Sequence, residues 1–286
     1  MNDFKERFIS RVDYIPTLPV VFNKILQTLN NPKSSAKDLK TIIINDMAIS
    51  AKILNLANSA YFGFNRRITE ITNAIVVIGF KTIKNIVLSI SIIDTFKKLS
   101  STGDFDRTQY WLNSIGSAQT AVKIGTLLNI PNKESLYISG LLSNIGRVLM
   151  DYFFPEFYTQ VIEKSNSSLK EVHEIEKEIF GFDHTEAGFQ VARKWEFPDS
   201  LADSIRFHHN LENAPEESRT LSAIVDLSNI ISRSSGLGTP VIEKSKTKIL
   251  KDCSEILNLN NSDIQKLIDE LQEQSETIKV FFKVIT

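Results

Sequence analysis

The sequence predicts an all-α fold built from two packed helical lobes and a C-terminal helical tail, at 1–100, 101–238 and 239–286. The first observation is that apolar residues recur at spacings of three and four along almost the whole chain. The second is the composition, because 286 residues with 42% hydrophobic content can bury sizeable cores without disulfide staples. The third is that neither a sequence repeat nor a glycine-rich nucleotide loop interrupts the pattern. Packed helical layers are the architecture that such a pattern favours.

The helices of the first lobe are delimited by capping residues and helix breakers. An amphipathic stretch runs from Val20 to Leu29 and is stopped by Asn30-Asn31-Pro32. Ser35 followed by Asp38 resembles a capping box that opens the next helix, and Asp46 can cap the one after it. The expected helices are 20–29, 39–45, one that begins at 46, 71–78 and 81–96, with a loop at 61–65.

The most apolar stretch, Ile71 to Phe96, is predicted to form two buried helices separated by Gly79. Its β-branched run at 86–93 would favour a strand, but the apolar residues from Ile83 onward keep helical spacing. Charged residues interrupt the stretch, whereas a membrane helix needs roughly 20 mostly apolar residues. The charged N-terminus also lacks the apolar segment of a signal peptide. We therefore expect a cytoplasmic protein without a membrane partner.

The second lobe and the tail are predicted to continue the helical pattern after a linker at 100–103. A break is expected at 235–240, where two glycines and a proline fall close together. The apolar stripes of the tail need burial, either on the second lobe or on another chain, so a homo-oligomer stays open. The expected helices are 110–128, 134–151, 155–165, 169–180, 185–195, 199–209, 219–234, 246–257 and 261–278.

Charge is distributed unevenly along the chain. The formal net charge is −1, but residues 1–100 carry 14 basic and 7 acidic side chains, whereas the remainder carries 19 and 27. The basic residues of the first lobe are scattered, apart from Arg66-Arg67 and Lys97-Lys98, and aromatic residues do not alternate with them. We therefore expect a protein partner rather than nucleic acid at this lobe. The single cysteine, Cys253, excludes an internal disulfide and a cysteine-based zinc site.

All histidines lie in the second half of the chain. Adjacent residues of a helix point about 100° apart, so one member of the pair His208-His209 can face inward as a metal ligand or phosphate contact. The alternative is that the pair lies at a helix C-terminus, which favours cationic side chains. His184 follows the expected helix cap Asp183, which explains its position without chemistry. His173 lies among glutamates and is expected on a solvated acidic face.

Short motifs in a fixed order resemble those of the HDOD family. The most specific is Asn58-Ser59-Ala60, followed by Tyr61-Phe62-Gly63, at the end of the segment 43–60. Met47 stands in this segment where the family usually has proline. The resemblance extends from about Tyr14 to about Gly238. Its other motifs are Pro16–Pro19, Ala74–Phe80, Gly140–Leu142, Ile145–Arg147, Gly181–Gly188, Trp195–Pro198 and His208-His209.

The resemblance implies a relative of the HD metal-dependent phosphohydrolases, which include the HD-GYP cyclic-dinucleotide phosphodiesterases. Those enzymes bind divalent metals through histidines and aspartates of several helices. This sequence departs from the pattern, because Ser143-Asn144 stands in place of the His-Asp dyad. Asn113 stands where another histidine is expected, two residues after Trp111. The last aspartate position falls at Asn229, although Asp226 lies one turn away.

Loss of these ligands predicts a pocket that performs no catalysis and holds no resident metal or cofactor. A hydrolytic metal must lower the pKa of a bound water, which needs several anionic or imidazole ligands at one point. If any metal binds, the ligands would be His184, His208 and His209. The expected residues of the vestigial pocket are Trp111, Asn113, Ser143, Asn144, His184, His208, His209, Asp226 and Asn229.

The resemblance further implies a non-catalytic signal-transduction or scaffold module that acts through signalling proteins. One alternative is a residual metal-dependent phosphohydrolase or cyclic-dinucleotide phosphodiesterase that uses the three histidines and Asp226. Another is a nucleotide-binding module without turnover in the same pocket. Metal analysis, turnover of a cyclic dinucleotide and ligand-induced stabilisation discriminate among the three.

Overall fold

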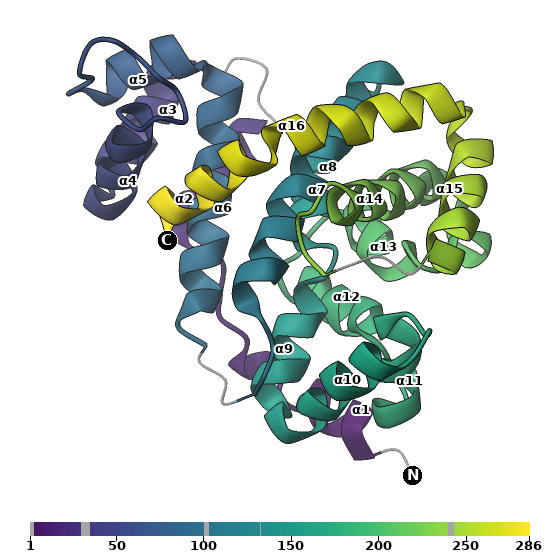
Figure 1. Ribbon diagram of the computed structural model, residues 1–286. Helices are drawn as coiled ribbons and strands as arrows, with labels where there is room; N and C mark the ends of the chain where they lie inside the picture. Colours follow the sequence, from purple (N-terminus) through teal and green to yellow (C-terminus); the bar gives the residue numbers. More distant parts are fainter. Residues whose placement is uncertain (1–2, 30–34, 100–102, 132, 240–242) are drawn as a thin grey trace. The chain divides into compact units, whose positions relative to one another are not determined.

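The computed structural model describes residues 3–29, 35–99, 103–131, 133–239 and 243–286. Within these ranges the chain forms helices, turns and bends and no strand, which confirms the all-α prediction (Figure 1). The chain divides into two compact units. We call residues 16–98 with 276–286 the basic unit, and residues 1–15 with 99–275 the histidine unit. Each is described by itself.

The basic unit contains the helices that the capping residues predict. Ser35 and Asp38 form the capping box at the start of α3, and the Asp46 carboxylate accepts from the backbone N–H of Ile49 at 3.0 Å at the start of α4. These hydrogen bonds satisfy N–H groups that a helix start otherwise leaves without partners. The expected stop at 30–32 lies outside the described residues. The helices are α2 (Val20–Leu29), α3 (Ala36–Ile44), α4 (Met47–Ala57), α5 (Ile71–Ile78) and α6 (Phe80–Lys97).

Helix α6 resolves the ambiguity between strand and helix. All residues from Ile86 to Ile93 are helical and buried, so the β-branched run is a core helix, as predicted. Gly79 separates α6 from α5 with a φ of 95°. In the described residues no single helix has the length and apolarity to cross a membrane. By those two criteria alone, the pair α5 and α6, bent by 114° at Gly79, would be a candidate.

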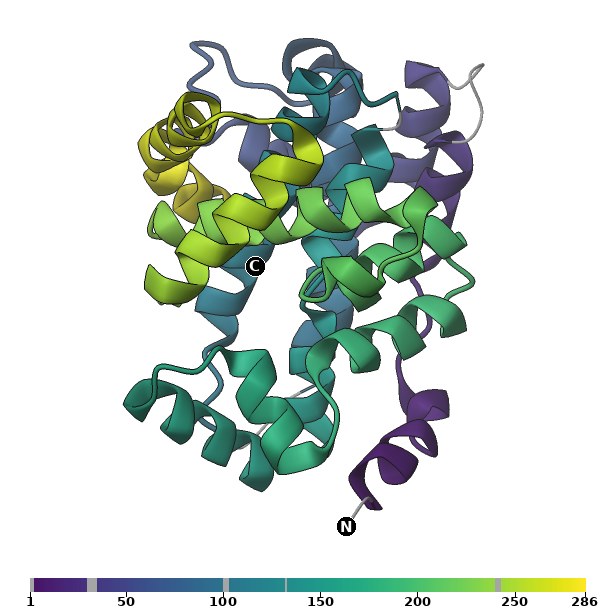
Figure 2. The same ribbon diagram turned by 90° about the vertical axis from the view of Figure 1, so that its right-hand side faces the viewer.

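The histidine unit is centred on α14, which packs against α7, α13 and α15 (Figures 1 and 2). Helix α7 also packs on α8, and α12 lies between α9 and α13. The expected linker residues 100–102 lie outside the described residues. The helices are α1 (Asp3–Ile9), α7 (Arg107–Leu127), α8 (Lys133–Leu142), α9 (Ile145–Phe153), α10 (Pro155–Ser167), α11 (Val172–Phe180), α12 (His184–Lys194), α13 (Asp199–Phe207), α14 (Glu216–Ser234), α15 (Glu243–Leu257) and α16 (Asn261–Ile285), the last of which ends in the basic unit.

The unit boundaries differ from the expected 1–100, 101–238 and 239–286 at both ends of the chain. At the N-terminus, the ring of Phe4 makes edge contacts with Phe154, Phe157 and Phe180, at centroid distances of 5.4, 4.7 and 5.2 Å. These contacts bury α1 against α9–α11, and aromatic pairs of this geometry add to the stabilisation from burial. At the other end, α15 packs on α14 rather than forming a separate tail. Helices α1 and α15 therefore belong to the histidine unit, whereas residues 276–286 belong to the basic unit.

One stretch predicted as a single helix forms two helices in the structure. The stretch 134–151 was expected to be continuous, but it breaks into α8 and α9 at Ser143-Asn144. Just after the break, Gly146 packs so closely that a Cβ would lie 2.0 Å from the carbonyl oxygen of His184. Only glycine lets α9 approach the start of α12 this closely. The break sets the Ser143 and Asn144 side chains at a corner rather than on a helix face.

Candidate functional site

Polar side chains from α7, α14 and the corner between α8 and α9 form a hydrogen-bonded network of neutral groups. At its centre, Asn229 Oδ1 accepts hydrogen bonds from Asn144 Nδ2 at 2.8 Å, Ser117 Oγ at 2.9 Å and Asn113 Nδ2 at 3.2 Å. Asn229 Nδ2 donates to Ser143 Oγ at 3.1 Å and to a backbone carbonyl of its own helix. All five side chains are buried. We call them the amide network.

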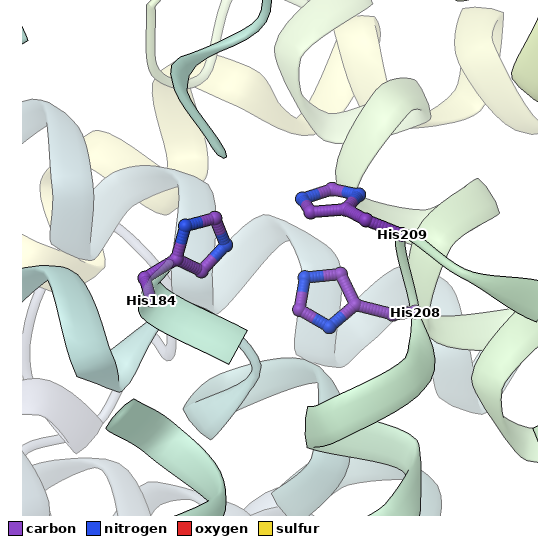
Figure 3. Close-up of side chains that lie close together, drawn as sticks. All are labelled: His184, His208 and His209. Carbon is purple, nitrogen blue, oxygen red and sulfur yellow. The ribbon is translucent and has the colours of Figure 1, made fainter. Parts of the chain in front are cut away.

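A cluster of three imidazoles comes from the start of α12 and the end of α13. His184 is the first residue of α12, whereas His208 caps the C-terminus of α13 and His209 follows it. One ligand atom from each ring lies within 4.8 Å of those of the other two. Figure 3 shows one nitrogen of each ring turned toward a common space. We call these residues the histidine cluster.

A buried chain of polar groups holds the His184 ring in place. Its Nδ1 lies 2.6 Å from Glu176 Oε2, which also accepts from the backbone N–H of His184 at 2.9 Å. Tyr158 donates to the other oxygen of Glu176 at 2.8 Å, and Arg147 Nε donates to the tyrosine oxygen at 3.0 Å. Gly181, in the left-handed conformation at the end of α11, turns the chain so that Glu176 faces His184. A carboxylate at Nδ1 places the proton there and leaves a lone pair on Nε2.

The other two rings are oriented in the same way. His208 Nδ1 lies 2.8 Å from the carbonyl oxygen of Ile205, which can only accept, so Nδ1 carries the proton. His209 Nδ1 lies 3.2 Å from Asp226 Oδ1. The ring of His173 stacks on that of His209, with centroids 4.3 Å apart. His173 is thus packed against the cluster, and the expected solvated acidic face at this residue is wrong.

Burial keeps most of these imidazoles uncharged. It lowers the pKa of His208 to about 3 and the pKa of His209 well below its ordinary value. It also lowers the pKa of His173. Burial alone would raise the pKa of Glu176, but the nearby His184 outweighs it and the pKa is lowered. Burial raises the pKa of Asp226 well above its ordinary value. His208 and His209 therefore offer neutral nitrogen donors at neutral pH, the form that binds metals.

Two cavities open beside these groups. One, of about 630 Å³, is lined by His173, His209 and Asp226 together with residues of α15, from Lys248 to Ile256. The other, of about 470 Å³, reaches Asn113 of the amide network and is lined by Arg147, Lys170 and Arg233. Helix α15 thus forms a wall of the first cavity, a role that the sequence does not indicate.

Comparison with known proteins identifies the family of this chain. Residues 15–211 match the family model of the HDOD domain. This chain belongs to the HDOD domain family. An uncharacterized protein of Treponema pallidum (strain Nichols) is 31% identical over 227 residues, which are 78% of this chain and 43% of that protein. The HDOD chain thus spans less than half the length of this curated relative.

Solved structures share the fold of this HDOD chain. An HDOD domain protein with unknown function from Geobacter sulfurreducens has a TM-score of 0.80 and 25% identity, and the match covers 96% of this chain and 95% of that one. A provisionally named phosphohydrolase from Shewanella amazonensis SB2B has a TM-score of 0.74 and 22% identity, with 98% of both chains covered. At that identity, the second likeness concerns the fold alone.

The HDOD structure places most of the expected pocket residues in one of two groups. Asn113, Ser143, Asn144 and Asn229 join the amide network, whereas Asp226 joins His209. Asn229 and Asp226 thus have separate contacts rather than being alternatives for one position. Among the described contacts, the buried ring of Trp111 meets Tyr110 rather than the amide network.

Several residues of the site are absent from the sequence-based prediction. Glu176 sits in an acidic stretch that reads as solvated, yet its side chain is fully buried. Ser117 lies one turn after Asn113 on α7, a spacing that could have suggested a shared face. Tyr158 and Arg147 reach Glu176 from other helices, which only the fold reveals.

Proposed function

We propose that this HDOD domain is a non-catalytic signal-transduction module that acts through protein partners. The observation that carries the proposal is the amide network. At the positions where the resemblance implies metal-binding histidine and aspartate, neutral amides and hydroxyls bind one another. A hydrolytic site must present an activated water to a phosphorus atom, and these groups supply neither negative charge nor an open ligand position. The same positions instead stabilise the contact between α7, α14 and the corner at Asn144.

A turnover assay tests the absence of catalysis. The full chain is incubated with a cyclic dinucleotide and with bis(p-nitrophenyl) phosphate, in the presence of Mg²⁺, Mn²⁺ or Ni²⁺. We expect no hydrolysis above that of the metal ion alone. Metal-dependent hydrolysis that His208→Ala abolishes would overturn the proposal in favour of a residual phosphohydrolase.

The basic unit is the proposed contact surface for the partner. It carries 13 basic and 5 acidic side chains, against 20 and 29 in the histidine unit. An acidic protein surface complements this excess and would associate faster through long-range attraction. Arg66 and Arg67 are neighbouring and exposed, so they are suited to a direct test.

Affinity capture with two charge-reversal variants tests this surface. Arg66→Glu with Arg67→Glu alters the basic unit, and Lys164→Glu with Lys266→Glu alters exposed positions of the histidine unit. We expect the first variant to lose a partner that wild type and the second variant retain. Equal retention by both variants would contradict a contact at this surface.

A second candidate function, ligand binding without turnover, is favoured by the cavity of about 470 Å³ beside Asn113. Its lining carries three cations, Arg147, Lys170 and Arg233, beside the carboxylates of Asp104, Asp106 and Glu171. The three cations offer partners to a phosphate-bearing ligand such as a nucleotide. A rise in Tm on adding a cyclic dinucleotide, lost in Arg233→Gln, would support this function. An unchanged Tm at saturating ligand would contradict it.

A further inference from the structure

We propose that His184, His208 and His209 together bind one divalent transition-metal ion of the nitrogen-preferring class, such as Zn²⁺, Co²⁺ or Ni²⁺. The proposal goes beyond the function above, because it concerns binding and holds whether or not any substrate is hydrolysed. Three imidazole nitrogens within 4.8 Å of one another are close to the spacing that a single ion requires. Zinc–nitrogen bonds are about 2.0–2.1 Å long, so binding would draw the three rings slightly together.

Two of the nitrogens are buried without a protein partner. In the described part of the chain, His184 Nε2 and His208 Nε2 are inaccessible and make no hydrogen bond. Buried polar atoms are nearly always satisfied, so a pair of orphaned atoms facing one space needs an explanation. Figure 3 shows both rings turned toward that space, with the His209 ring beside them. A metal ion would satisfy both atoms at once.

The opposite side of each ring is already fixed. Glu176 lies at Nδ1 of His184, the carbonyl oxygen of Ile205 at Nδ1 of His208, and Asp226 at Nδ1 of His209. Histidines that bind metals generally donate their other N–H to a carboxylate or a backbone carbonyl, which fixes tautomer and orientation. All three rings of the histidine cluster meet this condition, and in each case Nε2 is the nitrogen left for the ion.

The donor set decides the class of metal. Imidazole nitrogens suit zinc, nickel, cobalt and copper, whereas magnesium and calcium require oxygen ligands. The two carboxylates that contact rings of the cluster, Glu176 and Asp226, are engaged with Nδ1 atoms, and the amide network offers only neutral oxygen. The site is therefore mononuclear and selective for nitrogen-preferring ions. Three protein ligands leave a further position for water or a donor from another molecule.

Cobalt titration of the tag-free, full-length chain tests the site. The protein is treated with EDTA, dialysed, and titrated with Co²⁺ while visible absorption is recorded, and with Zn²⁺ while Tm is recorded. We expect one equivalent of cobalt to produce a tetrahedral spectrum that zinc abolishes, and zinc but not Mg²⁺ to raise Tm. Absence of a cobalt spectrum and of a zinc-dependent Tm shift in wild type would overturn the proposal.

Variants then assign the ligands. His184→Asn and His208→Asn are expected to lose binding, whereas His173→Asn, which alters a ring outside the cluster, should retain it. Glu176→Gln, a positioning variant, should bind about 10–100-fold more weakly. Binding that survives in both ligand variants would overturn the assignment. Because a buried histidine variant can fail to fold, ring-nitrogen NMR of wild type gives an independent measurement. Zinc should shift three Nε2 signals, and a shift confined to His173 would refute the proposal.

Discussion

Asn229 is the central residue of the amide network, where metal ligands are expected from the family resemblance. Its Oδ1 accepts three hydrogen bonds and its Nδ2 donates two, so both polar atoms of the side chain are fully hydrogen-bonded inside the protein. An aspartate of the same shape would keep the acceptor but lose both donors. It would also place a negative charge where no described cation lies within hydrogen-bonding distance of the network.

We therefore expect Asn229→Asp to lower the free energy of unfolding by about 2–4 kcal/mol at neutral pH, since unpaired buried polar and charged groups are costly. Urea unfolding followed by circular dichroism measures the change. Asn166→Asp is the matched control, because Asn166 is exposed in the same unit. A stability for Asn229→Asp equal to that of the control would show that the network contributes nothing.

His208 predicts a pH dependence of stability. Its pKa is lowered by burial to about 3 from an ordinary 6.5. Between these values the unfolded chain binds a proton at His208 that the folded chain does not, so acid favours unfolding. The stabilisation is complete above about pH 6.5 and declines as pH falls, at about 1.4 kcal/mol per pH unit for one such group.

Urea unfolding in EDTA at pH 7.5 and pH 5 measures this dependence. Asp226 acts in the opposite sense, because its raised pKa lets the folded chain hold a proton that the unfolded chain releases. The difference between wild type and His208→Gln therefore isolates the histidine. The variant should be less stable at pH 7.5 but lose less stability on acidification, and an identical loss in both proteins would refute the prediction.

At the residue scale, the motif resemblance predicts which positions have lost their ligands but not what replaces them. Ser143, Asn144 and Asn229 are identified by their place in the motifs, whereas their mutual hydrogen bonds depend on how α8, α9 and α14 meet. Glu176 is missed because a buried glutamate and a solvated one look alike in a sequence. The turn at Gly181, at the end of α11, brings His184 to it.

At the element scale, helix boundaries with a side-chain cap are predictable and breaks without one are not. Ser35 and Asp46 predict the starts of α3 and α4, and the structure shows the expected capping hydrogen bonds from backbone N–H groups to both side chains. The break at Ser143-Asn144 differs, because Asn144 precedes α9 without a side-chain capping hydrogen bond. The sequence also does not predict which unit α1 and α15 join. An apolar face shows that a helix must pack against another element, but not which element.

Helix α15 allows a direct test of how firmly it packs on α14. Cys253 of α15 is fully buried, and burial raises the pKa of its thiol well above the ordinary value. Because the thiolate is the reactive form, we expect a thiol reagent such as DTNB to label the native chain far more slowly than the chain in urea. Cys253→Ala with Glu255→Cys, which moves the thiol to an exposed position of the same helix, is the control. Native labelling of wild type as fast as that of the control would show that α15 does not stay docked.

At the scale of the whole molecule, the near-zero net charge conceals two units of opposite sign. The difference of basic and acidic side chains is +8 in the basic unit and −9 in the histidine unit. The unit boundaries sharpen the contrast of the sequence halves, because residues 276–286, with two basic side chains and one acidic, join the basic unit. Oppositely charged surfaces of different molecules attract over about 10 Å at 0.1 M ionic strength and over longer distances in dilute salt.

This asymmetry predicts that copies of the chain attract one another at low ionic strength and that added salt weakens the attraction. Static light scattering should give a second virial coefficient that rises as salt is added. The two charge-reversal variants separate asymmetry from net charge, since each replaces two lysines or arginines by glutamates and both have a net charge of −5. Arg66→Glu with Arg67→Glu reduces the basic unit to +4 and should weaken the attraction, whereas Lys164→Glu with Lys266→Glu brings the histidine unit to −13 and should retain it. Equal virial coefficients for the two variants would mean that net charge alone governs the interaction, and that the charge of the basic unit is no basis for attraction to an acidic partner.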